Sequence, residues 1–108
     1  MSYLLPENQT INGALYITCK KGSIRANHYH KKDTHYSYML KGKMEYTYQS
    51  VDSKTKNKII VKTGDIVATP PNTIHAMRFL EDSIFLALTT ETREREKYEK
   101  DTVRVKLI

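Results

Sequence analysis

Short runs rich in β-branched and aromatic residues recur along this chain of 108 residues, with turn-forming segments between them. Such residues favour strands because their side chains pack well on a pleated, half-buried surface. The separating segments contain glycine, proline, asparagine and aspartate, which favour turns. The runs lie at residues 15–19, 36–40, 44–48, 59–61, 66–68, 75–80 and 84–88. This alternation predicts an all-β sandwich or barrel.

The end of the chain departs from this pattern. Residues 91–100 form a dense charged segment, which predicts a turn or two of helix with Thr90 or Thr92 as its N-terminal cap. Residues 103–107 alternate apolar and basic side chains and predict an additional edge strand. We expect the charged segment either to pack across an opening of the β-structure or to remain in solvent.

Length and composition indicate one folded domain. A chain of 108 residues has room for one core of ordinary size, so we expect residues 1–108 to form a single domain. Hydrophobic residues make up 39% of the chain and charged residues 28%, which argues against a disordered protein. The longest apolar stretch, residues 84–88, is too short to span a membrane, and no secretory signal is recognisable, so we expect a cytoplasmic protein.

Cysteine content and charge restrict the kinds of site and ligand that the sequence allows. Cys19 is the only cysteine, so it can form neither an intramolecular disulfide nor a cysteine-type zinc site, and we expect an apolar strand residue. The formal charge is +6, but no nucleic-acid motif accompanies it, which favours a small anionic substrate over nucleic acid. Six lysines lie at or near expected hairpin turns, where lysine protects sheet edges: Lys41, Lys43, Lys54, Lys56, Lys58 and Lys62.

The four histidines carry the main functional signal. His28 and His30 are two residues apart, so on one strand both side chains point to the same face. His35 follows at an odd offset, but residues 31–34 indicate a tight connection that resets the alternation. All four histidines converge if His75, which follows a turn, also faces inward. Neutral imidazoles suit zinc, iron, nickel and copper, so the pattern favours a metal site.

Each histidine taken singly also fits a simpler interpretation. His28 and His30 would then be solvent-facing polar residues beside a basic turn, and His75 would be a half-buried strand residue. The joint spacing favours the metal interpretation, because four histidines in one small protein are hard to explain by packing alone.

The histidines and the residues around them resemble the two sequence motifs of the cupin superfamily. The first motif places a glycine, two histidines, a glutamate and a glycine at fixed intervals, and the second places glycine, proline, glycine, histidine and asparagine. The matching residues here are Gly22, His28, His30, His35 and Gly42, then Gly64, Pro70, Asn72, His75 and Phe79. The resemblance implies a single-domain cupin, a jelly-roll-like antiparallel β-barrel. It also implies that the four histidines bind one divalent transition metal: zinc, iron, manganese, nickel or copper.

Three positions depart from the family motifs. His35 stands where the family has glutamate, so the implied ligand set has one negative charge fewer. Asn72 replaces a turn glycine, a mild change because asparagine tolerates the left-handed backbone conformation. Phe79 replaces an asparagine that is not itself a ligand.

A closer resemblance is to the metal-binding cupin half of bifunctional capsule-sugar enzymes that epimerise and reduce nucleotide-linked 4-keto sugars. It rests on residues 25–30, on Thr34 and on the pair Asp101 and Thr102. The reductase half of those enzymes is absent from this sequence. The resemblance implies epimerase or isomerase chemistry on a nucleotide-linked or other anionic sugar.

The implied chemistry depends on the metal. Four histidines would leave two positions open on an octahedral metal and none on a tetrahedral zinc. An ion with open positions would polarise a ketone as a Lewis acid, while a base removes and returns the proton on the adjacent carbon. The base stays open among the nearest candidates along the chain, which are Tyr38, Tyr46, Tyr48 and Glu45.

Residues near the ligands are candidates for substrate contacts. Arg25 and Lys31 place positive charge beside the ligand strand, where they would hold phosphate or carboxylate. Two-residue spacing from the ligands His35 and His75 puts three more side chains on the same face of their strands. They are Met39, Met77 and Phe79, and we expect them to line the cavity. The eight tyrosines and the short basic edges are consistent with a homodimer.

Two other functions stay open at this point. Small all-histidine cupins also include dioxygenases that use iron, manganese or copper, and oxygen consumption would distinguish them. A non-catalytic sugar-binding or sensor cupin would instead have a closed four-coordinate metal with no adjacent pocket.

Overall fold

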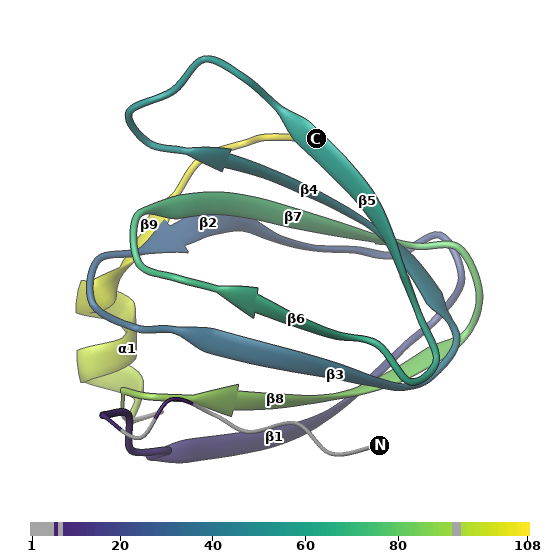
Figure 1. Ribbon diagram of the computed structural model, residues 1–108, viewed down its shortest axis with the longest axis horizontal. Helices are drawn as coiled ribbons and strands as arrows, with labels where there is room; N and C mark the ends of the chain where they lie inside the picture. Colours follow the sequence, from purple (N-terminus) through teal and green to yellow (C-terminus); the bar gives the residue numbers. More distant parts are fainter. Residues whose placement is uncertain (1–5, 7, 92–93) are drawn as a thin grey trace.

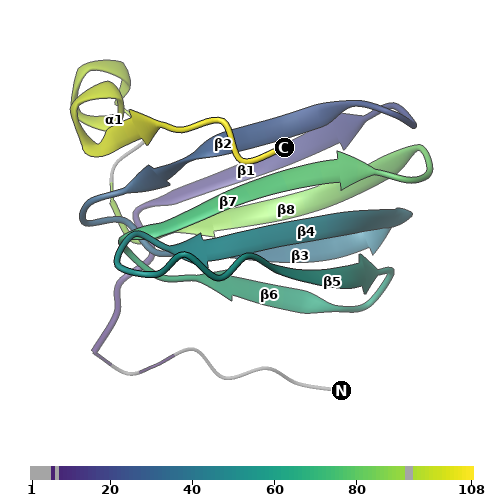
Figure 2. The same cartoon turned by 90° about the horizontal axis from the view of Figure 1, so that it is seen from above.

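The computed structural model describes residue 6 and residues 8–91 and 94–108, whose strands form two antiparallel sheets (Figure 1). One sheet has four strands in the order β1-β8-β3-β6, and the other has five in the order β5-β4-β7-β2-β9. The two sheets lie face to face (Figure 2). The strands are β1 (Gly13–Cys19), β2 (Ile24–His30), β3 (His35–Lys41), β4 (Lys43–Ser50), β5 (Asn57–Lys62), β6 (Ile66–Thr69), β7 (Thr73–Phe79), β8 (Ser83–Thr89) and β9 (Thr102–Arg104).

The predicted all-β, jelly-roll-like architecture is confirmed. Every run that the sequence assigned to a strand overlaps a strand of the structure. Among the described strands, no hydrogen-bonded ladder closes the two sheets into one continuous barrel, so the molecule is a sandwich of this class.

The hydrophobic core fills the space between the sheets. Met44 of β4 pairs with Phe79 of β7, and both side chains point inward. Phe79 meets Phe85 of the opposite sheet with ring centroids 5.8 Å apart. Met39 is fully buried in the same cluster, and Cys19 is a buried member of it, as expected for an apolar strand residue. Contacts of this kind across the sandwich hold the two sheets together.

A bulge in β2 decides which of its side chains face the core. Ala26 and Asn27 have φ angles of 71° and 55°, and the register with β7 shifts between Ala26 and His28. The extra residue brings Arg25 and His28 to the same face despite their odd spacing. Oδ1 of Asn27 accepts hydrogen bonds of 2.8 and 3.0 Å from the backbone N–H groups of residues 107–108. The C-terminal tail therefore holds the bulge in place.

The charged C-terminal segment forms one short helix, α1 (Arg95–Asp101). Glu94 occupies the N-cap position without a side-chain hydrogen bond, so Thr90 is not the cap, and Thr92 lies outside the described residues. The predicted terminal edge strand is confirmed over its first two residues by β9, which pairs with β2. Among the described residues, no helix combines the length and the apolar character needed to cross a membrane.

Candidate metal centre

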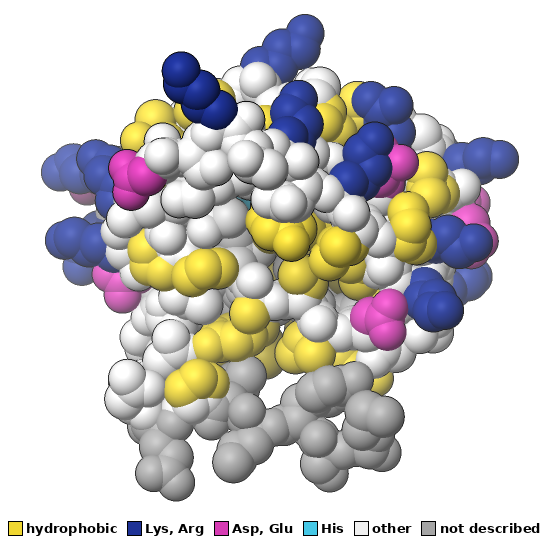
Figure 3. Space-filling view, turned by 45° about the horizontal axis from the view of Figure 1, so that its top comes forward, with side chains coloured by type: hydrophobic (Ala, Val, Ile, Leu, Met, Phe, Trp, Pro, Cys, Tyr) yellow, Lys and Arg dark blue, Asp and Glu magenta, His cyan; other side chains and the backbone are white. Residues whose placement is uncertain are grey.

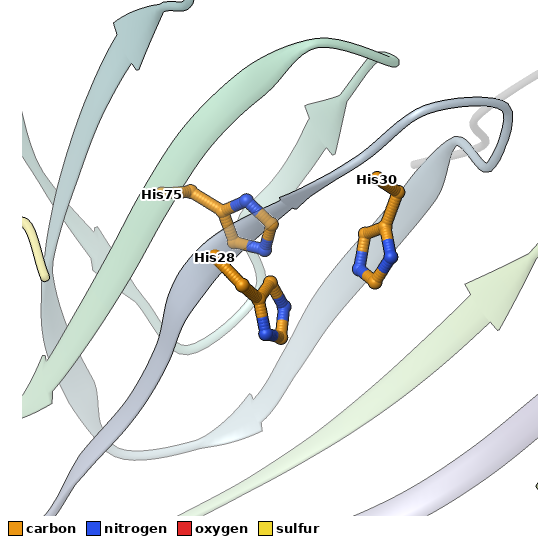
Figure 4. A group of neighbouring side chains, drawn as sticks. All are labelled: His28, His30 and His75. Carbon is orange, nitrogen blue, oxygen red and sulfur yellow. The ribbon is translucent and has the colours of Figure 1, made fainter. Parts of the chain in front are cut away.

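Three histidine side chains from two neighbouring strands point toward one another inside the sandwich (Figure 4). β2 carries His28 and His30, and His28 pairs directly with His75 of β7. The ring centroid of His28 lies 4.6 Å from that of His30 and 4.8 Å from that of His75. The two-residue alternation of a strand puts both histidines of β2 on its inner face, opposite the inner face of β7.

The three rings lie close enough together to hold a metal ion between them. Each offers one ring nitrogen, and these nitrogens all lie within 4.8 Å of one another. All three residues are buried, with exposed fractions of 9% for His28, 2% for His30 and 1% for His75. Nδ1 of His28 is buried and has no hydrogen-bond partner among the described residues, which is unusual for a polar atom in a protein interior. The residues present therefore fit a divalent metal ion.

Burial keeps the imidazoles of His28 and His75 neutral at neutral pH. Burial is the main cause that lowers the pKa of His28 to about 2, and the neighbouring His75 contributes to this shift. Burial also lowers the pKa of His75 to about 4, although a hydrogen bond to the backbone at Thr73 opposes the shift. A neutral imidazole is the form that binds metals, so His28 and His75 need to lose no proton on binding an ion at neutral pH.

Hydrogen bonds behind two of the rings fix their tautomers. Nδ1 of His75 lies 3.1 Å from the carbonyl oxygen of Thr73, which can only accept, so Nδ1 carries the proton. The hydroxyl of Thr102 donates to the carbonyl of Tyr98 at 2.8 Å and therefore accepts from Nδ1 of His30 at 3.2 Å. In both rings Nε2 keeps the lone pair that a metal ligand needs.

His35 belongs to the same cluster but has a carboxylate partner. Its ring stacks on His30 with centroids 4.4 Å apart and lies 6.3 Å from the ring of His75. Nε2 of His35 lies 2.7 Å from Oδ2 of Asp33. His30, Asp33 and His35 form a second group whose possible ligand atoms lie within 4.8 Å of one another. The structure thus gathers all four histidines, in two groups that share His30.

Asp33 is a site residue that the sequence reasoning missed. Its carboxylate is 1% exposed, and its Oδ1 accepts hydrogen bonds from the backbone N–H groups of Thr90 at 3.0 Å and Glu91 at 3.1 Å. Burial raises the pKa of Asp33, but the hydrogen bond with His35 and the backbone contacts outweigh it and hold the pKa below its usual value. The histidines therefore have a negative charge beside them. It comes from Asp33, in the turn between β2 and β3, and not from position 35, where the family motif has glutamate.

A cavity of about 60 Å³ opens beside the histidines. Arg25 and Met77, two of the predicted substrate-contacting residues, line it together with three of the histidines. Met39 and Phe79 are 0% and 1% exposed, lie in the core and are not among the described residues that line this cavity. Their burial favours a packing role, and contact with substrate stays a prediction for both.

Lys31 lines a second cavity, of about 390 Å³, which also includes residues of α1. We call it the lysine cavity, and the cavity beside the histidines the histidine cavity. The side chains that line it are Lys31, Lys32, Asp33, Glu91, Lys97, Tyr98, Lys100 and Asp101. Tyr98 also lines the histidine cavity, and its ring centroid lies 5.5 Å from that of His30. Tyr98 therefore borders both the lysine cavity and the histidine cavity.

Two of the predicted base candidates have other partners. The ring of Tyr46 lies 6.2 Å from that of His75, but its hydroxyl bonds with Thr69, and burial raises the pKa of Tyr46 to about 12. Glu45 forms an ion pair of 3.5 Å with Lys58 of the adjacent strand. A phenol that stays protonated and a carboxylate paired with a lysine are poor proton acceptors for the histidine cavity.

Comparison with known proteins agrees with this architecture. The model of a family described as "Cupin domain" matches residues 15–90, and no curated protein matches the chain. CapF, a capsular polysaccharide assembling protein from Staphylococcus aureus, has a similar structure, with a TM-score of 0.81 and 17% sequence identity. That match covers 92% of this chain and 30% of CapF, so the chain spans less than a third of the length of CapF.

Two 3,4-ketoisomerases, one of them a sugar 3,4-ketoisomerase, share the fold. The enzyme QdtA from Thermoanaerobacterium thermosaccharolyticum, solved in complex with TDP, has a TM-score of 0.73 and 23% identity over 87% of this chain and 66% of its own. A 3,4-ketoisomerase from Helicobacter canadensis has a TM-score of 0.74 and 23% identity over 87% and 68% of the two chains. With these folds in common and well over half of its residues matched by the family model, the chain belongs to the cupin domain family.

Proposed function

We propose that the chain is a metal-binding cupin that epimerises or isomerises an anionic sugar, with a nucleotide-linked keto sugar as the substrate class. The observation that carries the proposal is the convergence of three buried imidazoles, two of which, His28 and His75, line a cavity. The sugar part draws on the similar structures, since CapF is a capsular polysaccharide assembling protein and QdtA is a sugar 3,4-ketoisomerase.

The metal part of the proposal rests on three ligands. His28, His30 and His75 would hold one divalent transition metal, because their nitrogens are close together and two of the rings are already in the required tautomer. Zinc, iron, manganese, nickel and copper all accept imidazole ligands, and three protein ligands leave a position for substrate. When bound, such an ion supplies Lewis acidity that polarises a carbonyl oxygen and acidifies the neighbouring carbon.

His35 and Asp33 would take up and return the proton that the reaction removes from the substrate. If Nε2–H of His35 donates to the Asp33 carboxylate, Nδ1 is the atom that accepts a proton from substrate, and the carboxylate stabilises the imidazolium that forms. This role competes with the prediction from spacing that His35 is a fourth metal ligand. The short contact between His35 and Asp33 supports the proton-handling role.

The lysine cavity supports an anionic substrate. Lys31, Lys32, Lys97 and Lys100 lie around one hollow, where their ammonium groups would attract phosphate oxygens. Two of the three acidic residues there are already engaged, since Asp33 bonds with His35 and Asp101 accepts from the backbone N–H of Lys32 at 2.8 Å. A diphosphate held by the lysines would place its sugar past Tyr98, toward the histidines.

The test combines metal analysis with an exchange assay. Elemental mass spectrometry of the purified protein is expected to find close to one transition metal per chain. NMR in D2O is then expected to show deuterium entering the carbon beside the ketone of a TDP-linked 4-keto-6-deoxy sugar, and neither result is expected for His28→Ala. Tyr16→Ala, at an exposed site on β1, is the matched control.

Other outcomes assign the site differently. Deuterium exchange that survives in metal-free His28→Ala would rule out the metal as part of the reaction. Oxygen consumption by the metal-loaded protein without any deuterium exchange would favour the dioxygenase alternative, for which an all-histidine ligand set is also suited.

A further inference from the structure

A third cavity lies away from the histidines, at the open edge of the sandwich between β5 and β6. Its volume is about 430 Å³, within the range of pockets that bind small molecules. The proposed reaction gives it no role. Its lining residues come from β4, β5, β6, β7 and the connecting loops: Tyr46, Tyr48, Ser50, Ser53, Thr55, Asn57, Ile59, Val67, Ala68, Pro70 and Thr73.

The cavity is uncharged in a protein that is rich in charge. No lysine, arginine, histidine or acidic residue is found among its described lining residues, although 28% of the chain is charged. Figure 3 shows hydrophobic side chains across the middle of the face that it displays, with lysines and arginines around its edges. A charged ligand would lose hydration here without gaining a partner, so the lining selects for neutral molecules.

Two tyrosines form an aromatic wall. The ring centroids of Tyr46 and Tyr48 lie 5.7 Å apart, with an angle of 34° between the ring planes. Tyr46 is 2% exposed and its hydroxyl bonds with Thr69, so it is a fixed part of the wall, whereas Tyr48 is only half-buried. Rigid aromatic faces of this kind pack against the C–H face of a ligand ring.

The rim carries polar groups with unused hydrogen-bonding capacity. Neither the phenol of Tyr48 nor the side-chain amide of Asn57 bonds to another of the described residues. The hydroxyl of Ser53 accepts from the backbone N–H of Thr55 at 3.0 Å, which leaves its own proton to donate. The rim thus offers several neutral donors and acceptors to a ligand with hydroxyl groups.

We propose that this cavity is a second binding site, which takes an uncharged, hydroxyl-bearing ring of monosaccharide size. The aromatic wall fits the apolar face of such a ring, and the hydroxyls and amide at the rim fit its hydroxyl groups. Tyr46, which packs at 6.2 Å from His75, stands between this site and the metal cluster. The site does not depend on the metal or on the proposed reaction.

The experiment is an NMR titration of the ¹⁵N-labelled full chain with neutral and charged sugars. The neutral probes are the methyl glycosides of glucose, galactose, mannose, xylose and rhamnose, and the charged probe is glucose 1-phosphate. At least one methyl glycoside is expected to shift the backbone amides of Tyr48, Asn57 and Thr73 in a saturable way. Glucose 1-phosphate is expected to bind there at least about threefold more weakly.

Variants decide whether the tyrosine wall forms the site. Tyr48→Ala is expected to weaken glycoside binding about tenfold, and Tyr48→Phe, which keeps the ring, by about threefold. Tyr16→Ala removes an exposed tyrosine elsewhere and is expected to change nothing, and His28→Ala, which removes a proposed metal ligand, is expected to leave glycoside binding intact. The amide spectrum of each variant shows whether it is folded.

Three results would overturn the proposal. They are the absence of a saturable shift with every glycoside, equal affinity in the wild type and in a folded Tyr48→Ala variant, and tighter binding of glucose 1-phosphate at these amides. Because the metal and exchange assays use other residues, failure of the titration leaves the proposed function standing. Failure of the metal or exchange assay likewise leaves the second binding site standing.

Discussion

His75 and His35 contribute the same side chain to one cluster, yet their partners differ in kind. Nδ1 of His75 faces a backbone carbonyl at 3.1 Å, whereas Nε2 of His35 faces the carboxylate of Asp33 at 2.7 Å. A carbonyl fixes the tautomer but carries no charge, so burial still lowers the pKa of His75 to about 4. A carboxylate stabilises a protonated imidazole. The contrast teaches that hydrogen-bond partners, more than spacing along the chain, distinguish the proposed metal ligands from the proposed proton acceptor.

The largest expected effect comes from removing a proposed metal ligand, and the matched test of the comparison removes the histidine that is paired with the carboxylate. His28→Ala deletes a ring from the compact group of three, and we expect it to weaken metal binding by more than about a hundredfold, beyond the effect of changing a residue behind a ligand. His35→Ala is expected to weaken metal binding less than about tenfold. Metal affinity measured by competition with a chelator checks both. Equal losses in the two variants would make His35 a fourth ligand.

Asp33→Asn tests the carboxylate side of the comparison. Asparagine keeps the shape but loses the charge that His35 and the backbone N–H groups of Thr90 and Glu91 contact. We expect the free energy of unfolding to fall by about 2–3 kcal/mol, the typical loss for hydrogen bonds to a buried charged group. Urea denaturation measures it, with the exposed Asp52→Asn as control. A change no larger than that of the control would mean that the pair contributes nothing to stability.

The pH dependence of stability separates the two kinds of partner. Histidines whose pKa is lowered from 6.5 on folding bind fewer protons than in the unfolded chain, so the metal-free protein is expected to lose stability as the pH falls from 6.5 toward 4. The expected loss is on the order of 2–3 kcal/mol for each of the two histidines. Asp33, whose pKa is lowered from 3.8, loses its contribution only below that pH.

Urea denaturation across this pH range measures the effect. His75→Leu is expected to make the curve less steep between pH 6.5 and 4, because only His28 then contributes, whereas Asp33→Asn is expected to leave that part of the curve unchanged. A loss of stability that starts only below pH 4, even in the wild type, would show that the buried histidines are not held neutral.

The smallest expected effect concerns the group behind His30. Thr102→Val removes the hydroxyl that accepts from Nδ1 of His30, so the ring loses part of what fixes its tautomer. We expect metal affinity to fall about tenfold, as is usual when a hydrogen-bond partner of a metal ligand is removed. Thr55→Val, at an exposed loop position, is the control. An unchanged affinity would show that Asp101, 4.0 Å from the same nitrogen, is sufficient.

Much of the fold and part of the site could be predicted from local sequence. The strands came from short β-favouring runs between turns, and the shared face of His28 and His30 came from their two-residue spacing. The departure at Asn72 was also interpreted correctly, since that residue has a φ of 60°. Asp33 escaped the same reasoning, because the family motif directed attention to position 35 and an aspartate in a turn is ordinarily a turn residue.

The sequence by itself determined what depends on neighbours along the chain: the alternation of side chains, the turns and the glycine at position 42. There φ is 102°, a left-handed conformation that glycine adopts readily because it has no Cβ atom. Only the tertiary structure decided which groups contact the members of the cluster. The backbone groups that hold Asp33 lie 57 and 58 residues away, and the hydroxyl behind His30 lies 72 residues away. Spacing along one strand carries no information about partners that folding brings from so far.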